Sequence, residues 1–349
     1  MRYKIDTSEI FRKIHNINPG PEQTAAYIEE IRKADMAGDP YAMLRLRSSM
    51  AVFVPFYDDA TKVLPYCAEF FQIAEEHPEA VAAYDSFTVA REAATLSIIL
   101  PQIELPVCEK MFGKMEEVAG TLRCGAIRRL HMICTEFYTY IDLQKAQEHY
   151  SIFNNEKMGS YSACSACEQQ VKVWYTLKKG DAKLAHEMAN KIFNGKLECH
   201  DIPWQTYAVF LEHYMDEGSL DGHESFVKKL MQGGCRDVSD LANAGTVLRC
   251  MAAVNIEKGL RLLAQYWRWT VNMWNEQALY FFYKGAWCCC RQANLCGKER
   301  TLYPPQGLNI GINTTKFFEE WFYNKAIQAA EKFDRRNGTN FYMDDLGRA

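Results

Sequence analysis

The chain has 349 residues, of which 48% are hydrophobic and 24% are charged, a composition typical of a folded globular protein. A formal net charge of −4 without any basic block excludes the electrostatic footprint of a nucleic-acid-binding protein. No run approaches the roughly 18 uncharged apolar residues of a membrane helix, and no apolar stretch follows the charged start, as it would in a signal peptide. We therefore expect a cytoplasmic protein whose 13 cysteines are reduced thiols.

Helical periodicity runs through almost the whole chain, and no segment shows the alternation of a strand. In the first third, helices are expected over residues 7–15 and 22–37, from 40 onward, over 57–76, and from the His77-Pro78 break to about residue 100. Within the 57–76 helix we expect Asp58 to be the N-cap and Pro65 to be an interior irregularity.

The pattern becomes more regular from residue 105 onward. Helices are expected over 106–119, 121–140, 142–157, 162–179, 181–194, 203–217, 219–232, 238–254, 256–271 and 274–296. The segment 302–313, rich in Pro and Gly, is expected to be a loop. A last long helix over 314–336 follows, and the tail after Gly338 is expected to fray.

A two-residue turn recurs between these helices at intervals of 37 to 39 residues. The turns are Ile141-Asp142, Gly180-Asp181, Gly218-Ser219 and Asn255-Ile256. Such a period is typical of stacked helical hairpins, each of which must be covered by its neighbours. The expected fold is therefore all-α, a right-handed superhelical solenoid of antiparallel helical hairpins.

Four segments are expected along this chain. They are an N-terminal helical cap (1–37), irregular helical hairpins (38–120), a repeat array (121–296), and a loop with a C-terminal capping helix (297–349).

The hairpins around the turns resemble those of tetratricopeptide-repeat proteins. Alanine follows the turn by about five residues in two units, and an aromatic residue precedes it in two, at Ala146, Ala185, Phe137 and Tyr214. His223 and Leu260 depart from the alanine position, and the period exceeds the family's 34 residues. The resemblance covers residues 121–296 best and implies an architecture without naming a ligand.

A weaker resemblance is to bacterial peptide-sensing regulators that use tetratricopeptide arrays. Many of those begin with a DNA-binding helix-turn-helix, which is not expected here because Asn18-Pro19-Gly20-Pro21 interrupts the first helices. The resemblance is therefore to members whose N-terminal helices bind another protein.

The tetratricopeptide resemblance implies that the first helix of each hairpin lines a concave groove. Counting back from each turn gives the positions Arg128, His131, Tyr138, Gln170, Trp174, Gln205, Glu212, Arg249 and Tyr283. We expect the two arginines to hold a peptide carboxylate and the two glutamines to bond its backbone. The alternative is that these residues are only the solvated face of each hairpin.

Two cysteine motifs invite a metal or redox function. Cys164-x-x-Cys167 lacks a second pair of zinc-knuckle spacing, since Cys199-His200 is not such a pair, and helix packing is the favoured interpretation. Packing is also favoured for Cys288-Cys289-Cys290, of which at least one thiol is expected to point away from the core. The histidines are scattered, so we expect no catalytic residues, no metal and no cofactor.

The expected function is that of a non-catalytic scaffold that binds a peptide or protein segment in the groove, with no nucleic-acid or membrane partner. The alternative is a peptide-responsive signalling regulator that acts on a second protein through its N-terminal helices, and an enzyme on a helical scaffold is less favoured. Whether the chain's own last helix fills the groove is left open, because Phe317, Phe318, Trp321 and Phe322 can fold back as an internal cap. The oligomeric state is also left open.

Overall fold

The computed structural model describes residues 5–122, 124–218 and 220–349 of the chain. The first residues, on which the expectation about a signal peptide rests, and Ser219 of the third turn lie outside these ranges. Helices make up 74% of the structure, and its strands are a two-residue antiparallel pair, β1 (Thr301–Leu302) and β2 (Asn313–Thr314). The prediction of an all-α fold is therefore confirmed. Each helix of the described ranges is too short or too polar to traverse a lipid bilayer.

The chain divides into two compact units that are interleaved in sequence. The first unit holds Met1–Ile98, Leu105–Ile133 and Phe153–Ser162, and the second holds Ile99–Glu104, Cys134–Ile152 and Ala163–Ala349. The predicted division into four consecutive segments stays a prediction.

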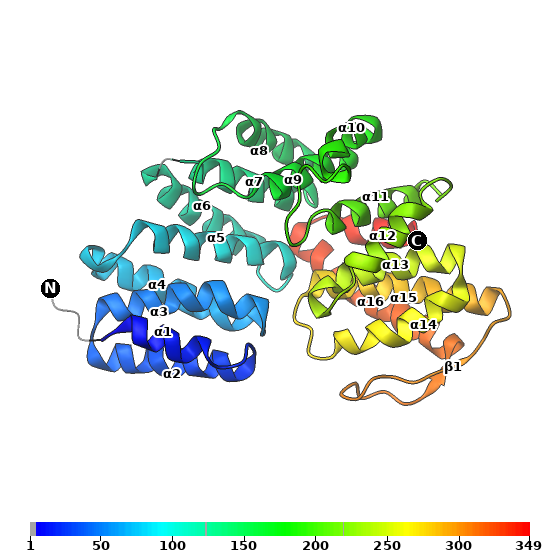
Figure 1. The fold of residues 1–349 in the computed structure, drawn as a ribbon, viewed down its shortest axis with the longest axis horizontal. Helices are drawn as coiled ribbons and strands as arrows, with labels where there is room; N and C mark the ends of the chain where they lie inside the picture. Colours follow the sequence, from blue (N-terminus) through cyan, green and yellow to red (C-terminus); the bar gives the residue numbers. More distant parts are fainter. Residues whose placement is uncertain (1–4, 123, 219) are drawn as a thin grey trace. The chain divides into compact units, whose positions relative to one another are not determined.

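The first unit is built from helices at the N-terminal end of the chain (Figure 1). Its helices are α1 (Thr7–His15), α2 (Pro21–Ala37), α3 (Pro40–Phe53), α4 (Leu64–Glu76), α5 (Ala83–Ile99) and α6 (Leu105–Thr121), with short 3-10 turns at Val54–Phe56, Ala60–Val63 and Pro78–Ala80. The expected 57–76 helix was wrong in its start, because α4 begins at Leu64. Pro65 therefore lies in the first turn, where its missing N–H costs nothing.

Two further helices, α7 (Ala126–Thr139) and α8 (Leu143–Asn155), contribute residues to both units, as α5 does through Ile99. The expected start of the first of them at residue 121 was wrong. Cys124 and Gly125 adopt positive φ values of 67° and 90°, which end the preceding helix before α7 can begin.

The second unit continues with pairs of helices. They are α9 (Ser165–Lys178) and α10 (Ala182–Phe193), α11 (Trp204–Asp216) and α12 (Glu224–Gly233), α13 (Leu241–Val254) and α14 (Ile256–Tyr266), then α15 (Glu276–Leu295), α16 (Thr315–Asn337) and α17 (Phe341–Gly347), with 3-10 turns at Val238–Asp240 and Trp267–Thr270. The first helices contact one another in the order α9, α11, α13, α15, and each contacts its own second helix. The last helix pair consists of α15 and α16, which pack along each other (Figure 1).

Side chains at the junctions explain why the helices begin where they do. Asp142, Asp181 and Asn255 each accept hydrogen bonds from backbone N–H groups of the helix that follows, at 2.8 to 3.2 Å. These caps satisfy donors that a helix start leaves unpaired. The recurring polar turn residue of the sequence is thus an N-cap in these three junctions.

The core of the second unit is rich in aromatic rings. Trp267 is 1% exposed and packs against Phe318 and Phe322 of α16, each with ring centroids 4.9 Å away. The fold-back of α16 buries both phenylalanines, whereas Phe317 stays exposed. The expectation of a frayed tail was wrong, because the chain turns at Gly338 and forms α17, which buries Tyr342 and Leu346.

Candidate functional site

The residues predicted to line a groove are divided between the two units. Arg128 and His131 belong to the first unit and the remaining positions to the second. The Arg128 side chain is buried and donates from Nη1 to the carbonyl oxygens of Phe153 (2.7 Å) and Glu156 (2.5 Å). Arg128 thus ties the start of α7 to the end of α8, and burial lowers the pKa of His131.

In the second unit, the predicted positions differ in their exposure. Gln205 is exposed, Tyr283 is half-buried, and Tyr138 is buried with its ring stacked on His149. Gln170 is buried and accepts a hydrogen bond of 2.6 Å from Thr206. The binding of a peptide backbone by Gln170 and Gln205 stays a prediction.

Glu212 and Arg249 meet in a buried ionic cluster. Arg249 is 1% exposed, and its Nη1 donates to Glu212 Oε2 and to Asp216 Oδ1, both at 2.8 Å. Lys284 of α15, also 1% exposed, donates from Nζ to the same Glu212 oxygen at 2.6 Å and to Asp345 Oδ2 of α17 at 2.9 Å. We name Glu212, Asp216, Arg249, Lys284 and Asp345 the ionic cluster.

The opposite charges of the ionic cluster hold one another in the charged state. Burial opposes ionisation of Asp345, but Lys284 and Lys178 outweigh it and hold the pKa of this carboxyl well below its usual range. Burial likewise opposes the charge of Lys284, yet Asp345 and Glu212 raise its pKa. The pKa of Glu212 is lowered by Lys284 and Arg249 against the effect of burial. All three groups are therefore charged at neutral pH.

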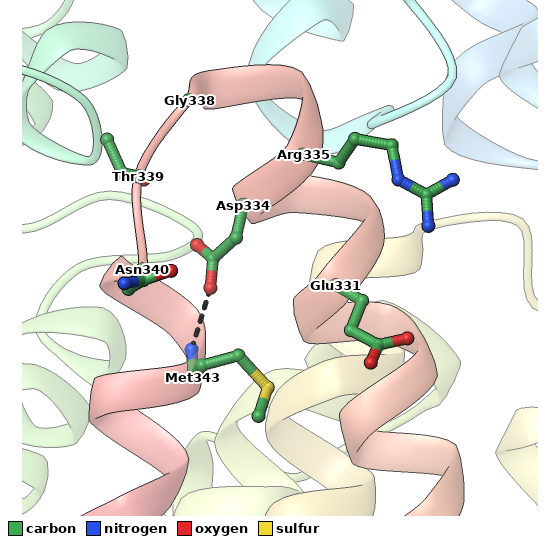
Figure 2. Close-up of a pocket in the computed structure, with 7 residues that line it drawn as sticks. All are labelled: Glu331, Asp334, Arg335, Gly338, Thr339, Asn340 and Met343. Carbon is green, nitrogen blue, oxygen red and sulfur yellow. Dashed lines mark hydrogen bonds between the residues drawn. The ribbon is translucent and has the colours of Figure 1, made fainter.

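A carboxylate on α16 fixes the turn into α17. Asp334 accepts hydrogen bonds from the backbone N–H groups of Tyr342 (3.0 Å) and Met343 (2.9 Å), at the start of the short helix. Figure 2 shows Asp334 pointing into the corner between the two helices, whereas Glu331 and Arg335 lie on the outer side. The small hollow at this corner follows from the chain reversal, and its central carboxylate already has both oxygens occupied.

The remaining contacts of α17 are aromatic and polar. Tyr342 stacks on Tyr140 at 5.6 Å between ring centroids, and its hydroxyl accepts a hydrogen bond of 2.9 Å from Gln277. Tyr280 donates its hydroxyl to the Tyr342 carbonyl (2.8 Å) and to Asp345 (2.6 Å). The ammonium of Lys178 lies 5.3 Å from the centre of the Phe341 ring.

These contacts place α17 across one face of the second unit. Partners of α17 itself come from the turn after α7 (Tyr140), from α9 (Lys178) and from α15 (Gln277, Tyr280 and Lys284). Asp216 of α11 and Arg249 of α13 bind Arg348, the C-cap residue of α17. This is the set of helices that the repeat resemblance predicted to line the groove. We name these partner residues the α17-binding face.

Charge on this face is unbalanced without α17. Lys178, Arg249 and Lys284 are cationic, whereas Glu212 and Asp216 are the anionic members of the ionic cluster on the same helices. The Asp345 carboxylate of α17 pairs with Lys284, and Arg348, the C-cap residue of α17, pairs with Asp216 and Asp345. The buried ammonium of Lys284 therefore favours an occupant that carries an acidic group, as α17 does.

Acidification is expected to release α17. The pKa of Asp345 is depressed in the folded chain, so its contribution to stability is complete above about pH 5, begins to fall near the unfolded pKa of about 4, and is lost only as the pH falls through the much lower folded pKa. The pKa of Glu212 is also lowered, so its contribution to stability is likewise lost on acidification. The pKa of Asp334 is raised by burial, so protonation of Asp334 stabilises the folded chain and opposes this loss.

Hydrogen exchange of the Phe341–Gly347 amides measures this release. We expect their protection, corrected for the intrinsic rate, to fall between about pH 5 and 3, while the amides of α10 serve as the internal reference. The Asp345→Asn chain should start with lower protection and change less with pH. Unchanged protection of α17 at about pH 3 would contradict the assignment of the ionic cluster as its anchor.

Comparisons with known proteins do not assign this chain to a family. No protein-family model matches the chain, and no curated protein is significantly similar to it in sequence.

Proposed function

We propose that the chain is a non-catalytic binding scaffold, a right-handed solenoid of tetratricopeptide-like hairpins that recognises a peptide or protein segment. The observation that carries this proposal is that a short helix, α17, already lies on the face formed by the first helices of successive pairs. The order of contacts α9, α11, α13, α15 and the spacing of the capped turns support the repeat architecture.

The contacts of α17 suggest the chemistry of the ligand. Tyr342 supplies an aromatic ring and Asp345, one helical turn later, supplies the carboxylate that Lys284 binds. Residues three apart lie on one face of a helix. A partner helix with an aromatic residue followed by an acidic one at this spacing can replace α17, which makes α17 an internal competitor.

Competition by a tethered segment lowers the apparent affinity of a free ligand for the same site. A helix joined to its site by a short linker acts at an effective concentration in the millimolar range. A free ligand can therefore bind only the fraction of chains in which α17 has left the α17-binding face. Partner binding is therefore expected to be tighter in chains whose α17 is removed or loosened.

The test uses a fluorescently labelled peptide with the sequence of residues 339–349 and a chain that ends at Gly338. We expect the peptide to bind the shortened chain, measured by fluorescence anisotropy, and to bind the full chain at least about 10-fold more weakly. A peptide carrying the change Asp345→Asn should lose about 10-fold or more in affinity, because it cannot neutralise Lys284.

A selection experiment then separates ligand recognition from mere internal packing. Peptides selected from a random displayed library on the shortened chain should compete with the labelled peptide and carry an aromatic residue three positions before an acidic one. If circular dichroism shows that the shortened chain is folded and yet neither the labelled nor any selected peptide binds the α17-binding face, the proposal fails. Should the shortened chain not fold, the full chain with Tyr342→Ala and Asp345→Asn takes its place.

A further inference from the structure

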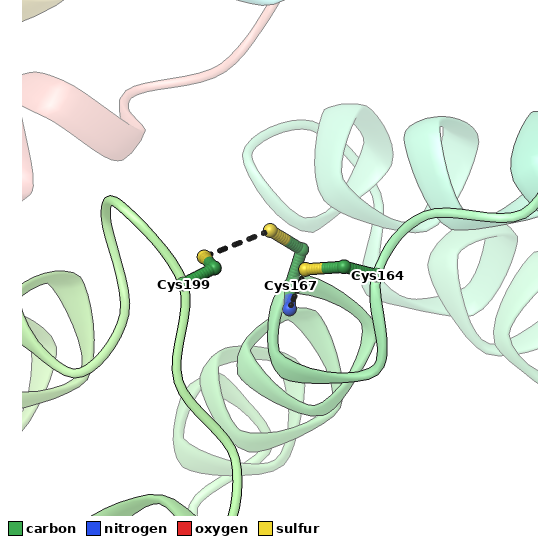
Figure 3. Close-up of side chains that lie close together, drawn as sticks. All are labelled: Cys164, Cys167 and Cys199. Carbon is green, nitrogen blue, oxygen red and sulfur yellow. Dashed lines mark hydrogen bonds between the residues drawn. The ribbon is translucent and has the colours of Figure 1, made fainter.

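Three cysteines from two separate segments of the second unit converge on one point. Cys164 is the N-cap residue of α9, Cys167 lies in the first turn of this helix, and Cys199 lies in the loop that follows α10 (Figure 3). Their sulfur atoms all lie within 4.8 Å of one another, and the Sγ atoms of Cys167 and Cys199 are 3.6 Å apart. We name these three residues the cysteine cluster.

The sulfur spacing fits ligands of one metal ion. A disulfide requires sulfurs about 2.05 Å apart. Tetrahedral zinc with Zn–S bonds of about 2.3 Å places two thiolate sulfurs about 3.8 Å apart. The separation of 3.6 Å between the sulfurs of Cys167 and Cys199 is close to the second value, and the sulfur of Cys164 lies within 4.8 Å of both.

The backbone around the cysteine cluster is already held in place. The N–H of Cys167 donates to the sulfur of Cys164 at 3.3 Å, which favours a negatively charged sulfur at the start of α9. In the loop, the Cys199 N–H donates to the Ile202 carbonyl at 3.0 Å, and Arg236 donates to the His200 carbonyl at 3.2 Å. The site therefore needs little ordering when an ion binds.

A small apolar cluster lies beneath the sulfurs. Ala166, Ile192 and Ile202 are buried there, and Cys167 and Cys199 pack against them half-buried. Cys164 is exposed, so solvent reaches the cysteine cluster on this side. Apolar support on one side and solvent on the other suit three thiolate ligands with water as the fourth.

We propose that Cys164, Cys167 and Cys199 form a binding site for a thiophilic divalent ion, zinc, with the fourth position open to water. Binding replaces thiol protons by the ion, so up to three protons are released and no electron is transferred. The ion links the start of α9 to the loop after α10. Thiolate ligands select zinc over magnesium or calcium, which require oxygen ligands.

The test titrates the reduced full-length chain with Co²⁺ as a spectroscopic probe and then with Zn²⁺, without oxygen. We expect the sulfur-to-cobalt charge-transfer absorption and the visible bands of tetrahedral Co²⁺ at one ion per chain, both lost on addition of one equivalent of Zn²⁺. Cys167→Ser and Cys199→Ser should each lower Zn²⁺ affinity by more than the roughly 10–100-fold that outer-shell changes cause.

Matched variants separate the site from the other thiols and from misfolding. Cys164→Ser removes one thiolate but keeps a good N-cap for α9, so it should weaken metal binding while the helix remains. Cys296→Ser removes another exposed cysteine and should leave binding unchanged. The proposal is overturned if the Cys167→Ser or Cys199→Ser chain binds Zn²⁺ as the unaltered chain does, or if the reduced chain binds none.

Discussion

Replacing Lys284 with methionine is expected to lower the free energy of unfolding of the second unit by about 3–5 kcal/mol. Lys284 is 1% exposed, and its ammonium lies between the carboxylates of Glu212 and Asp345. Methionine preserves the length of the side chain but leaves both carboxylates without this cation. The cost arises because an uncompensated buried charge is far less stable than a paired one.

Tryptophan fluorescence during urea unfolding measures this loss. All 7 tryptophans, from Trp174 to Trp321, lie in the second unit, so their emission follows the unfolding of that unit. Lys332→Met is the matched control, because Lys332 pairs with Glu276 at the surface, where such a pair contributes about 0–1 kcal/mol.

A double-variant cycle tests the pairing itself. Adding Asp345→Leu to Lys284→Met removes the unpaired carboxylate, so the two changes together should cost less than the sum of the separate costs. Additive costs, or a Lys284→Met chain as stable as the Lys332→Met chain, would show that this pair does not hold α17 in place.

Gly285→Ala is expected to destabilise the second unit by about 3 kcal/mol, at the upper end of what overpacking usually costs. Gly285 on α15 and Gly245 on α13 lie where these helices cross, and a Cβ on Gly285 would overlap the carbonyl oxygen of Gly245. A Cβ on Gly245 would in turn overlap the carbonyl of Phe281. Backbone atoms cannot rotate away as a side chain can, so the two helices must separate.

Gly347→Ala provides the control for this substitution. Gly347 ends α17, and a Cβ there would meet no atom within 4 Å. The control should be close to neutral, whereas Gly285→Ala should shift the urea midpoint downward, followed again by tryptophan fluorescence. Equal midpoints for the two variants would contradict a close crossing of α13 and α15.

Helix positions in the second unit could be predicted because their signals are local. Asp181 and Asn255 mark helix starts through hydrogen bonds to backbone groups only three residues away. The apolar spacing of a hairpin is likewise a property of a few turns. The predicted 181–194 helix accordingly differs little from the observed Ala182–Phe193.

The short helix α17 could not be predicted in the same way. A helix of 7 residues has little stability of its own, and Asp334, Tyr280 and Lys284 hold it from outside. Its sequence, after the helix-ending Gly338, therefore resembled a frayed tail. The aromatic pair Phe341-Tyr342 with Leu346 was the available sign that this segment packs.

The candidate site was only partly accessible from the sequence. Glu212 and Arg249 were chosen by counting back from the turns, and both belong to the ionic cluster. For α15 the count selected Tyr283 instead of Lys284, and one residue changes the direction of a helical side chain by about 100°. The overlooked signal was Lys284 as the one charged residue within the apolar stretch 278–290 of α15. Cys199 joins Cys164 and Cys167 through the tertiary fold, which a spacing rule does not describe.

The position of Asp345 in the chain has a consequence for synthesis on the ribosome. Lys284 and Arg249 are made 61 and 99 residues before their respective partners Asp345 and Arg348. The charge of Arg249 is already paired with Glu212 and Asp216, but Lys284 lacks one of its two carboxylates until Asp345 emerges. We therefore expect α15 to pack firmly only after Asp345 has been made. Completion of this unit is thereby coupled to the translation of its last helix.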